Sequence, residues 1–136
     1  MAVVDELIRI NEDGTISFGN YKLDSKSKLD NFEHNGDIYK VKTFREITKL
    51  EKNGMFVYES VPGTTVHHLV ITDDKVEMKI EGMDDPQITL ELEPESEYKV
   101  YVDNASIGSM KTNISGKLNL SVEIGGADVA VKIVKI

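Results

Sequence analysis

From about residue 64 to residue 136, the chain repeats a short segment of alternating apolar and polar residues followed by a turn. In residues 75–82, KVEMKIEG, the apolar side chains of Val76, Met78 and Ile80 alternate with charged ones. Alternation with a period of two puts one set of side chains on a buried face and the other in water. The pattern predicts seven strands, near residues 65–71, 75–82, 87–93, 97–103, 106–112, 117–124 and 128–135. Such strands are typical of an antiparallel β-sandwich of immunoglobulin or fibronectin type III character.

The segment before residue 64 has a less regular pattern, and the turn signal Pro62-Gly63 marks the boundary. Residues 7–18 predict a hairpin around Asp13-Gly14, and residues 37–44 and 55–61 predict two more strands. We therefore expect a mainly-β protein. A C-terminal immunoglobulin-like sandwich, residues 64–136, would carry a smaller β-rich N-terminal segment, residues 1–63.

Residues 43–54 fit two alternatives. Asn53-Gly54 can form the two-residue turn of a hairpin between residues 47–52 and 55–61. In the other alternative, Thr43 and Glu46 form a capping box that begins a short helix over residues 44–52. Both alternatives are compatible with the mainly-β class.

The formal net charge of the 136 residues is −8. Binding to nucleic acid phosphates or to an anionic membrane needs a basic surface, so neither partner is expected. The chain has no cysteine, which excludes disulfides and thiolate chemistry. It shows no signal peptide or membrane-spanning apolar run, so we expect a cytoplasmic protein, although a chain whose leader had been removed would look the same.

The candidates for catalysis are Glu59 and His68. Glu59 is the one acidic residue in the apolar stretch of residues 55–61, where burial could raise the pKa of a carboxyl group and make it a proton donor. His68 could act as a base, and a Ser-His-Asp set could be assembled from Ser60, His67 or His68, and Asp73. The alternative for each residue is an ordinary structural position on a strand. Since adjacent residues of a strand face opposite sides, His67 and His68 are not expected to bind one metal ion.

The candidates for ligand binding are Tyr58, Tyr101 and His67. Alternation places Tyr101 on the outer face of its strand, and Tyr58 and Tyr39 could also face outward. An exposed aromatic ring could stack on a sugar or contact a protein partner, whereas a ring beneath the N-terminal segment would be structural. We expect no cofactor, with one alternative: the acidic turns at residues 73–74 and 84–85 could bind calcium.

Two resemblances to known families add to this picture. Residues 97–103, EYKVYVD, and 117–123, KLNLSVE, resemble the small immunoglobulin-like or fibronectin type III-like C-terminal modules of bacterial polysaccharide-acting enzymes, which are non-catalytic. Residues 16–21, ISFGNY, and 53–63, NGMFVYESVPG, resemble a group of short uncharacterised bacterial proteins, some of which carry the label endosialidase. The resemblance transfers no catalytic residue to this chain.

These observations favour a non-catalytic binding or assembly module that acts through a protein partner or self-association. The alternative is a carbohydrate-active, endosialidase-like enzyme that uses Glu59 with a second carboxylate or His68, or a sugar-binding module. An enzyme needs a concave site with converging carboxylates or histidine, whereas a module needs an exposed face or an interface.

Overall fold

The structure is a computed structural model that describes residues 3–124 and 127–136. Within these residues it contains thirteen β-strands and no helix. Their bounds are β1 Ile8–Ile10, β2 Ile16–Phe18, β3 Ser27–His34, β4 Asp37–Phe44, β5 Ile47–Lys52, β6 Met55–Val61, β7 Thr65–Ile71, β8 Lys75–Glu81, β9 Gln87–Glu91, β10 Glu97–Val102, β11 Ala105–Lys111, β12 Lys117–Ser121 and β13 Val129–Lys135. The described residues therefore form no helix that could cross a membrane.

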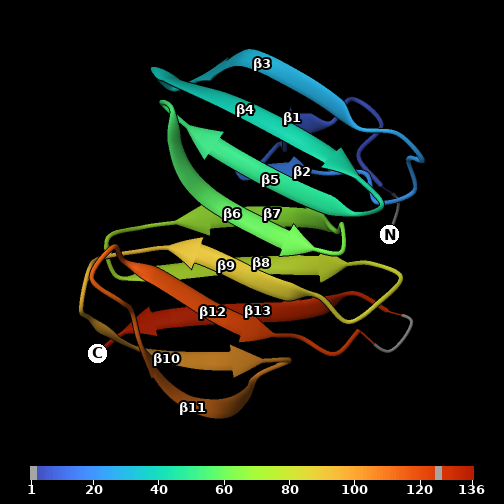
Figure 1. Cartoon of the computed structure of the whole chain (residues 1–136). Helices are drawn as coiled ribbons and strands as arrows, with labels where there is room; N and C mark the ends of the chain where they lie inside the picture. Colours follow the sequence, from blue (N-terminus) through green and yellow to red (C-terminus); the bar gives the residue numbers. More distant parts are fainter. Residues whose placement is uncertain (1–2, 125–126) are drawn as a thin grey trace.

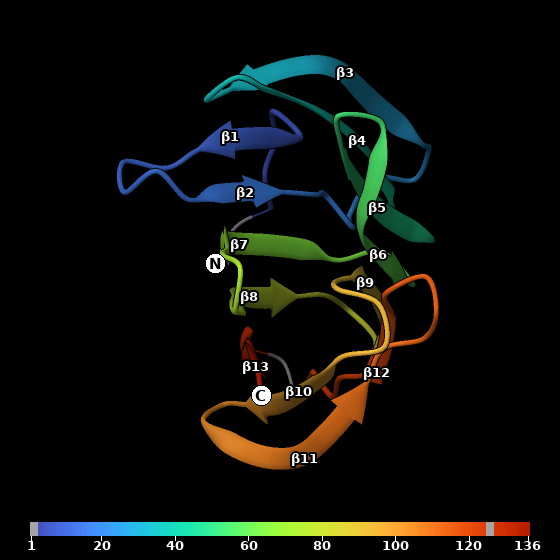
Figure 2. The ribbon, with the colours of Figure 1, turned by 90° about the vertical axis from the view of Figure 1, so that its left-hand side faces the viewer.

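The strands form two antiparallel sheets that pack face to face. One sheet has seven strands in the order β1-β2-β7-β8-β13-β10-β11, and the other has six in the order β12-β9-β6-β5-β4-β3. Figure 1 shows the strands stacked from β3 at the top to β11 at the bottom. In Figure 2 the two sheets appear as two layers, with β2, β7 and β8 in one and β4, β5 and β6 in the other. The architecture is consistent with the predicted β-sandwich.

Both sheets contain strands from either side of Pro62-Gly63. In the seven-stranded sheet β2 pairs with β7, and in the six-stranded sheet β6 pairs with β9. Each of these four strands contributes to one buried cluster, through Phe18, Val66, Tyr58 and Ile88 respectively. The residues before and after position 63 therefore share one core. The seven strands after residue 63 divide five to two between the sheets, whereas a constant-type immunoglobulin domain divides its strands four to three.

Residues 43–54 form strands and a turn, so the hairpin alternative is confirmed and the helix over residues 44–52 is wrong. Thr48 and Leu50 are fully buried while Ile47, Lys49 and Glu51 are only partly buried, which is the period of a strand. Asn53 and Gly54 have φ values of 53° and 77°, the positive values that a type I′ turn requires at both positions.

Strand β3 was not predicted, because a bulge breaks its hydrophobic pattern. Leu29 and Phe32 both pack against the core but lie three residues apart. The register with β4 shifts between them, and Asn31 has a φ of 58°. The extra residue of a bulge changes the side-chain spacing, so period-two alternation could not reveal this strand.

Five buried hydroxyl groups lie within the core, where β4, β5 and β6 meet the start of β7. Tyr58 and Ser60 each pair with the Thr64 hydroxyl, at 2.8 and 2.7 Å. The Thr48 hydroxyl donates to the Thr64 carbonyl oxygen at 2.8 Å and accepts from the Thr64 amide at 3.0 Å. Thr43 completes the hydroxyl cluster through its 2.8 Å bond to Thr48. A buried polar group is tolerated only when it is hydrogen-bonded, and these groups bond to one another.

Candidate functional site

His68 and Tyr101, which are predicted site residues from distant parts of the sequence, line the same hollow. This His68 hollow has a volume of about 350 Å³ and lies on the outer face of the seven-stranded sheet. Four strands that are neighbours in the sheet, β7, β8, β13 and β10, form its floor. Its polar lining includes Asp13, Thr15, His68, Glu77, Tyr101 and Lys132. The turn between β1 and β2 contributes Asp13 and Thr15, neither of which was predicted as a site residue.

A β-bulge in β7 positions His68. His67 pairs with Lys79 and Val70 with Glu77, so that His68 and Leu69 together oppose a single residue of β8. His68 has a φ of 55°, in the left-handed region that a residue with a Cβ seldom adopts. Its backbone amide donates to the Ser17 hydroxyl at 3.2 Å. Bulges commonly redirect a side chain, and this one holds the exposed His68 imidazole beside the β1–β2 turn.

Asp13, Thr15 and His68 form a hydrogen-bonded chain at the rim of the hollow. The Thr15 hydroxyl donates its single proton to the Asp13 carboxylate at 2.5 Å. The 3.1 Å contact between Thr15 Oγ1 and His68 Nδ1 must then be donated by the imidazole N–H. His68 Nε2 takes no part in this chain. In the neutral tautomer it is therefore available as a hydrogen-bond acceptor.

The electrostatics of the rim favour a charged carboxylate at Asp13. Hydrogen bonds from the Thr15 hydroxyl and amide lower the pKa of Asp13 below its ordinary value, and nearby His68 lowers it further. The Asn11 amide donates to both Thr15 and Ser17, at 3.0 and 2.8 Å, and so fixes the turn. Asp13 is consequently an acceptor at neutral pH and not a proton donor.

The opposite side of the hollow combines an aromatic ring with charged groups. Tyr101 on β10 is partly buried and lies directly across from Lys132 on β13. Glu77 lies 3.7 Å from Lys132 and 3.7 Å from Lys75. Ala130 and Asn104 also line the hollow. An aromatic ring with donors and acceptors around it is the composition of a site for a small polar ligand.

His67 is buried and does not line the hollow, so the expectation that it binds a ligand at the surface is wrong. It pairs with Lys79 and lies on the opposite face of β7 from Val66, which belongs to the core. Its side chain is only 4% exposed, and Nε2 lies 3.9 Å from a Glu81 carboxylate oxygen. Burial lowers the pKa of His67, and Glu81 opposes part of that change. His67 and His68 lie at the bulge, between the inward-facing Val66 and Leu69, so the strict alternation expected for this pair is interrupted there.

Tyr58 is fully buried, so the expectation that it faces a ligand is wrong. Its strand, β6, is flanked by β5 and β9, and alternation turns Tyr58 inward against Phe18, with ring centroids 5.4 Å apart in an edge-to-face arrangement. Burial raises the pKa of Tyr58 to about 12. Tyr39 is also buried, with 8% of its surface exposed.

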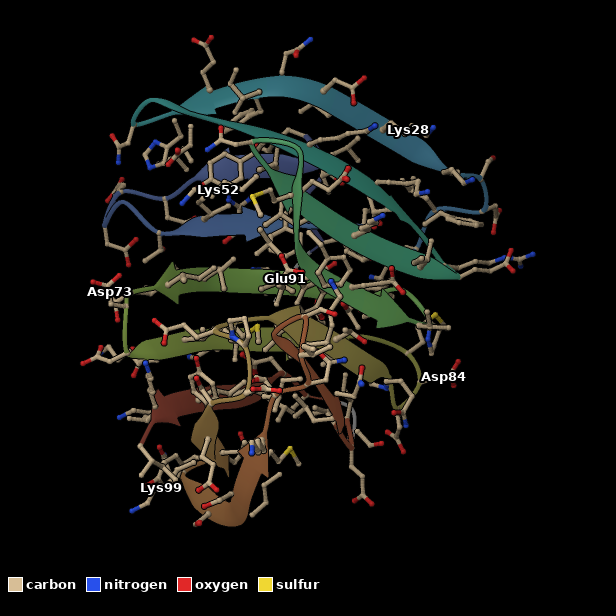
Figure 3. The ribbon with its side chains drawn as sticks, turned by 60° about the vertical axis from the view of Figure 1, so that its left-hand side comes forward. Lys28, Lys52, Asp73, Asp84, Glu91 and Lys99 are labelled. Carbon is tan, nitrogen blue, oxygen red and sulfur yellow. The ribbon has the colours of Figure 1, made fainter. Side chains whose placement is uncertain are left out.

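Glu59 and His68 lie on opposite outer faces of the sandwich. Glu59 follows the inward-facing Tyr58 on β6 and lies between Lys49 of β5 and Thr89 of β9. The core therefore separates the two residues that were expected to form a catalytic pair. Ser60 is fully buried beside Thr64, whereas Asp73 lies in the exposed β7–β8 turn at the edge of the molecule (Figure 3). The structure does not bring the Ser60, histidine and Asp73 set together.

The acidic turns make local hydrogen bonds. Asp74 accepts from the Thr72 hydroxyl at 3.0 Å, and Asp85 accepts from the Ile124 amide at 2.8 Å. Across residues 3–124 and 127–136, the structure shows no group of three or more His, Asp or Glu side chains arranged to hold a metal ion.

A second hollow, of about 290 Å³, opens between the two sheets on the other side of the Asp13 turn. Core residues such as Tyr39 and Leu50 form part of its wall. The polar side of its mouth carries Asp37, which accepts from Asn53 at 2.9 Å and lies 3.4 Å from Lys52. These groups already satisfy one another, so the His68 hollow is the better candidate for a ligand site.

Comparisons of the chain with protein-family models, with curated proteins and with solved structures found no match.

Proposed function

We propose that the protein is a non-catalytic binding module that holds a saccharide in the His68 hollow. The observation that carries the proposal is the meeting of His68 and Tyr101 in one hollow, beside a turn that fixes the imidazole through Thr15. Sugars present hydroxyl groups around an apolar ring face. A partly exposed tyrosine ring can cover such a face while Nε2 of His68 and the Asp13 carboxylate accept hydrogen bonds from hydroxyl groups.

The charges in the hollow favour binding over hydrolysis. Glycoside hydrolysis usually needs one carboxyl group with a raised pKa as the acid and a second carboxylate across the sugar. The pKa of Asp13 is lowered, and Glu77 lies between two lysine ammonium groups. Asp13 is therefore not suited to donate a proton at neutral pH.

Calorimetric titration with a panel of neutral and acidic oligosaccharides would test the proposal. We expect at least one member to bind, and Tyr101→Ala and His68→Asn each to weaken that binding roughly tenfold, about 1.4 kcal/mol. Asparagine tolerates the left-handed conformation, so His68→Asn should keep the bulge. His34→Asn is the matched control, because His34 lies at the end of β3 and does not line the hollow.

Three results would count against the proposal. If no saccharide binds, or if the two variants bind as well as the wild type, the hollow is not a saccharide site. If the titrated saccharide is cleaved, chromatography of the products would favour the enzyme alternative. If Tyr101→Ala instead changes the sedimentation coefficient, this sheet face would serve self-association.

A further inference from the structure

Three lysines lie directly opposite one another on the outer face of the six-stranded sheet. Lys28 of β3 pairs in register with Lys42 of β4, and Lys42 pairs with Lys49 of β5. Cross-strand partners share a face of the sheet, so the three ammonium groups form a row across three strands. Lys40 lies on the same face of β4, two residues from Lys42. These side chains, with Glu51, line a hollow of about 180 Å³.

This lysine row (Lys28, Lys42 and Lys49) stands out in an acidic protein. Residues 22–52 hold eight of the 16 Lys and Arg residues but only six of the 24 Asp and Glu residues, a net charge of +2. The rest of the chain has a net charge of −10. In Figure 3, Lys28 lies on β3 at one end of the molecule, whereas Lys99 lies near the other end. The positive charge is therefore concentrated on one part of one sheet.

Acidic side chains border the row, since Glu59 of β6 lies opposite Lys49 and Glu51 of β5 lies opposite Lys40. Lys40 lies 3.9 Å from Asp30, but among the described residues no ion pair involves Lys28, Lys42 or Lys49. Partial burial lowers the pKa of Lys42, and the neighbouring lysines, including Lys28 and Lys49, lower it further. Like charges directly opposite each other destabilise a sheet, so the row opposes folding in the absence of a bound anion.

We propose that the lysine row binds a compact polyvalent oxyanion, one that carries several phosphate or sulfate groups. Neighbouring strands are about 4.8 Å apart, so the three lysines span about 10 Å. A ligand with two or three anionic groups matches this length. Lysine ammonium groups act as point charges with rotatable donors, which suits tetrahedral oxyanions approached from several sides.

The surroundings of the row favour a compact anion over a nucleic acid chain. A long polyanion would extend beyond the positive region and meet the acidic remainder of the surface. Binding of single strands also relies on exposed aromatic rings on which bases stack. Phe56 lies close to this face, but the Lys117 ammonium group already covers its ring at 4.1 Å from the centroid.

The test uses the full chain, with inorganic tripolyphosphate as one probe and a sulfated heparin disaccharide as the other. Thermal unfolding is followed in metal-free buffer at low salt, with sodium chloride added to equal ionic strength as the reference. A ligand that binds only the folded state raises the melting temperature. We expect at least one probe to do so, and isothermal titration to show roughly tenfold weaker binding for Lys42→Glu.

Lys99→Glu is the matched control, since it makes the same charge change on an exposed position of β10. We expect it to bind the probe within about twofold of the wild type, which the small effect of a distant, screened charge predicts. Lys49→Gln, which removes one positive charge without adding a negative one, should give an intermediate loss. Without any probe, Lys42→Glu should raise the melting temperature, because it converts two like-charge pairs into opposite-charge pairs.

The pattern across the two probes identifies the source of the ligand. A stronger response to tripolyphosphate indicates a phosphate ligand, and a stronger response to the disaccharide indicates a sulfated one. The proposal is overturned if neither probe raises the melting temperature above the sodium chloride reference, or if Lys42→Glu and Lys49→Gln bind like Lys99→Glu. It is equally overturned if a 20-nucleotide single strand binds through the same lysines and both compact probes fail.

Discussion

The hydroxyl cluster in the core allows a sharp test of how the two sheets are joined. Replacing Thr48 with valine keeps the size and branching of the side chain but removes an oxygen that takes part in three hydrogen bonds. The amide and carbonyl groups of Thr64 and the hydroxyl of Thr43 would each lose a partner. All three residues are fully buried, so water cannot replace the lost bonds without opening the core.

The expected cost follows from these counts. An unsatisfied buried polar group costs about 1–3 kcal/mol, and burial of the added methyl group returns about 0.8 kcal/mol. With two backbone groups affected, we expect Thr48→Val to lower the free energy of unfolding by about 2–4 kcal/mol. For a chain of this size, that corresponds to a fall in melting temperature of about 8–15 °C.

Urea unfolding with two companion variants would check the reasoning. Thr48→Ser keeps the hydroxyl group and removes one methyl group, so it should cost about 1 kcal/mol. Thr89→Val makes the same change as Thr48→Val on the outer face of β9, where the hydroxyl bonds to Asn119, and should stay within about 0.5 kcal/mol of the wild type. If Thr48→Val is no more destabilising than these two variants, the hydrogen bonds of Thr48 do not stabilise the junction.

Three further predictions concern single residues. Because burial lowers the pKa of His67 below its ordinary value of 6.5, the unfolded chain binds a proton there more readily, and stability should fall as the pH decreases through about 6.5. In urea unfolding between pH 7.5 and 5.5, the free energy of unfolding should change less with pH in His67→Gln than in His34→Gln. Equal changes in the two variants would show that His67 does not cause the pH dependence. Because His68 has a positive φ, His68→Val should lower the stability by about 1–2 kcal/mol, whereas His68→Gly and His68→Asn should stay near the wild type. Equal melting temperatures of the three variants in calorimetry would exclude strain at the bulge. An alanine Cβ at Gly63 would lie 2.0 Å from the Phe44 carbonyl oxygen, so Gly63→Ala should lower the free energy of unfolding by about 3 kcal/mol or more. At Gly14 nothing lies within 4 Å but φ is positive, so Gly14→Ala should cost about 1 kcal/mol. Comparable losses for the two variants in urea unfolding would show that the close contact at Gly63 relaxes.

Local sequence pattern was enough to predict most strands of this fold. The alternation in residues 75–82 and the Asn53-Gly54 turn each depend on neighbouring residues only, and both predictions are confirmed. Strand β3 was missed because its bulge at Asn31 changes the spacing of the two apolar side chains. Tyr58 was placed on the wrong face because residues 55–61 carry apolar side chains at odd and even positions alike. Only the pairing of β6 with β5 and β9 decides which face is buried.

The candidate sites depend on strand order, which local pattern does not contain. His68 and Tyr101 were selected individually, but they meet only because β13 lies between β8 and β10. Asp13 and Thr15 belong to a turn that was predicted, and their polar side chains were the available signal for the rim of the hollow. The lysine row could not be predicted, because Lys28, Lys42 and Lys49 align only once the registers of three strands are set.

The position of β13 has a consequence for folding during synthesis. This strand pairs with β8 on one side and with β10 on the other, so Ile133 is matched with Val76 and Val100, which are made long before it. Until residues 129–135 leave the ribosome, the β10–β11 hairpin has no sheet to join, and β8 presents an unpaired edge. Exposed strand edges promote association with other chains, and such long-range pairings form slowly. The nascent chain therefore passes through a stage in which most of its strands exist but the seven-stranded sheet is divided in two, and a chaperone that shields strand edges would act at that stage.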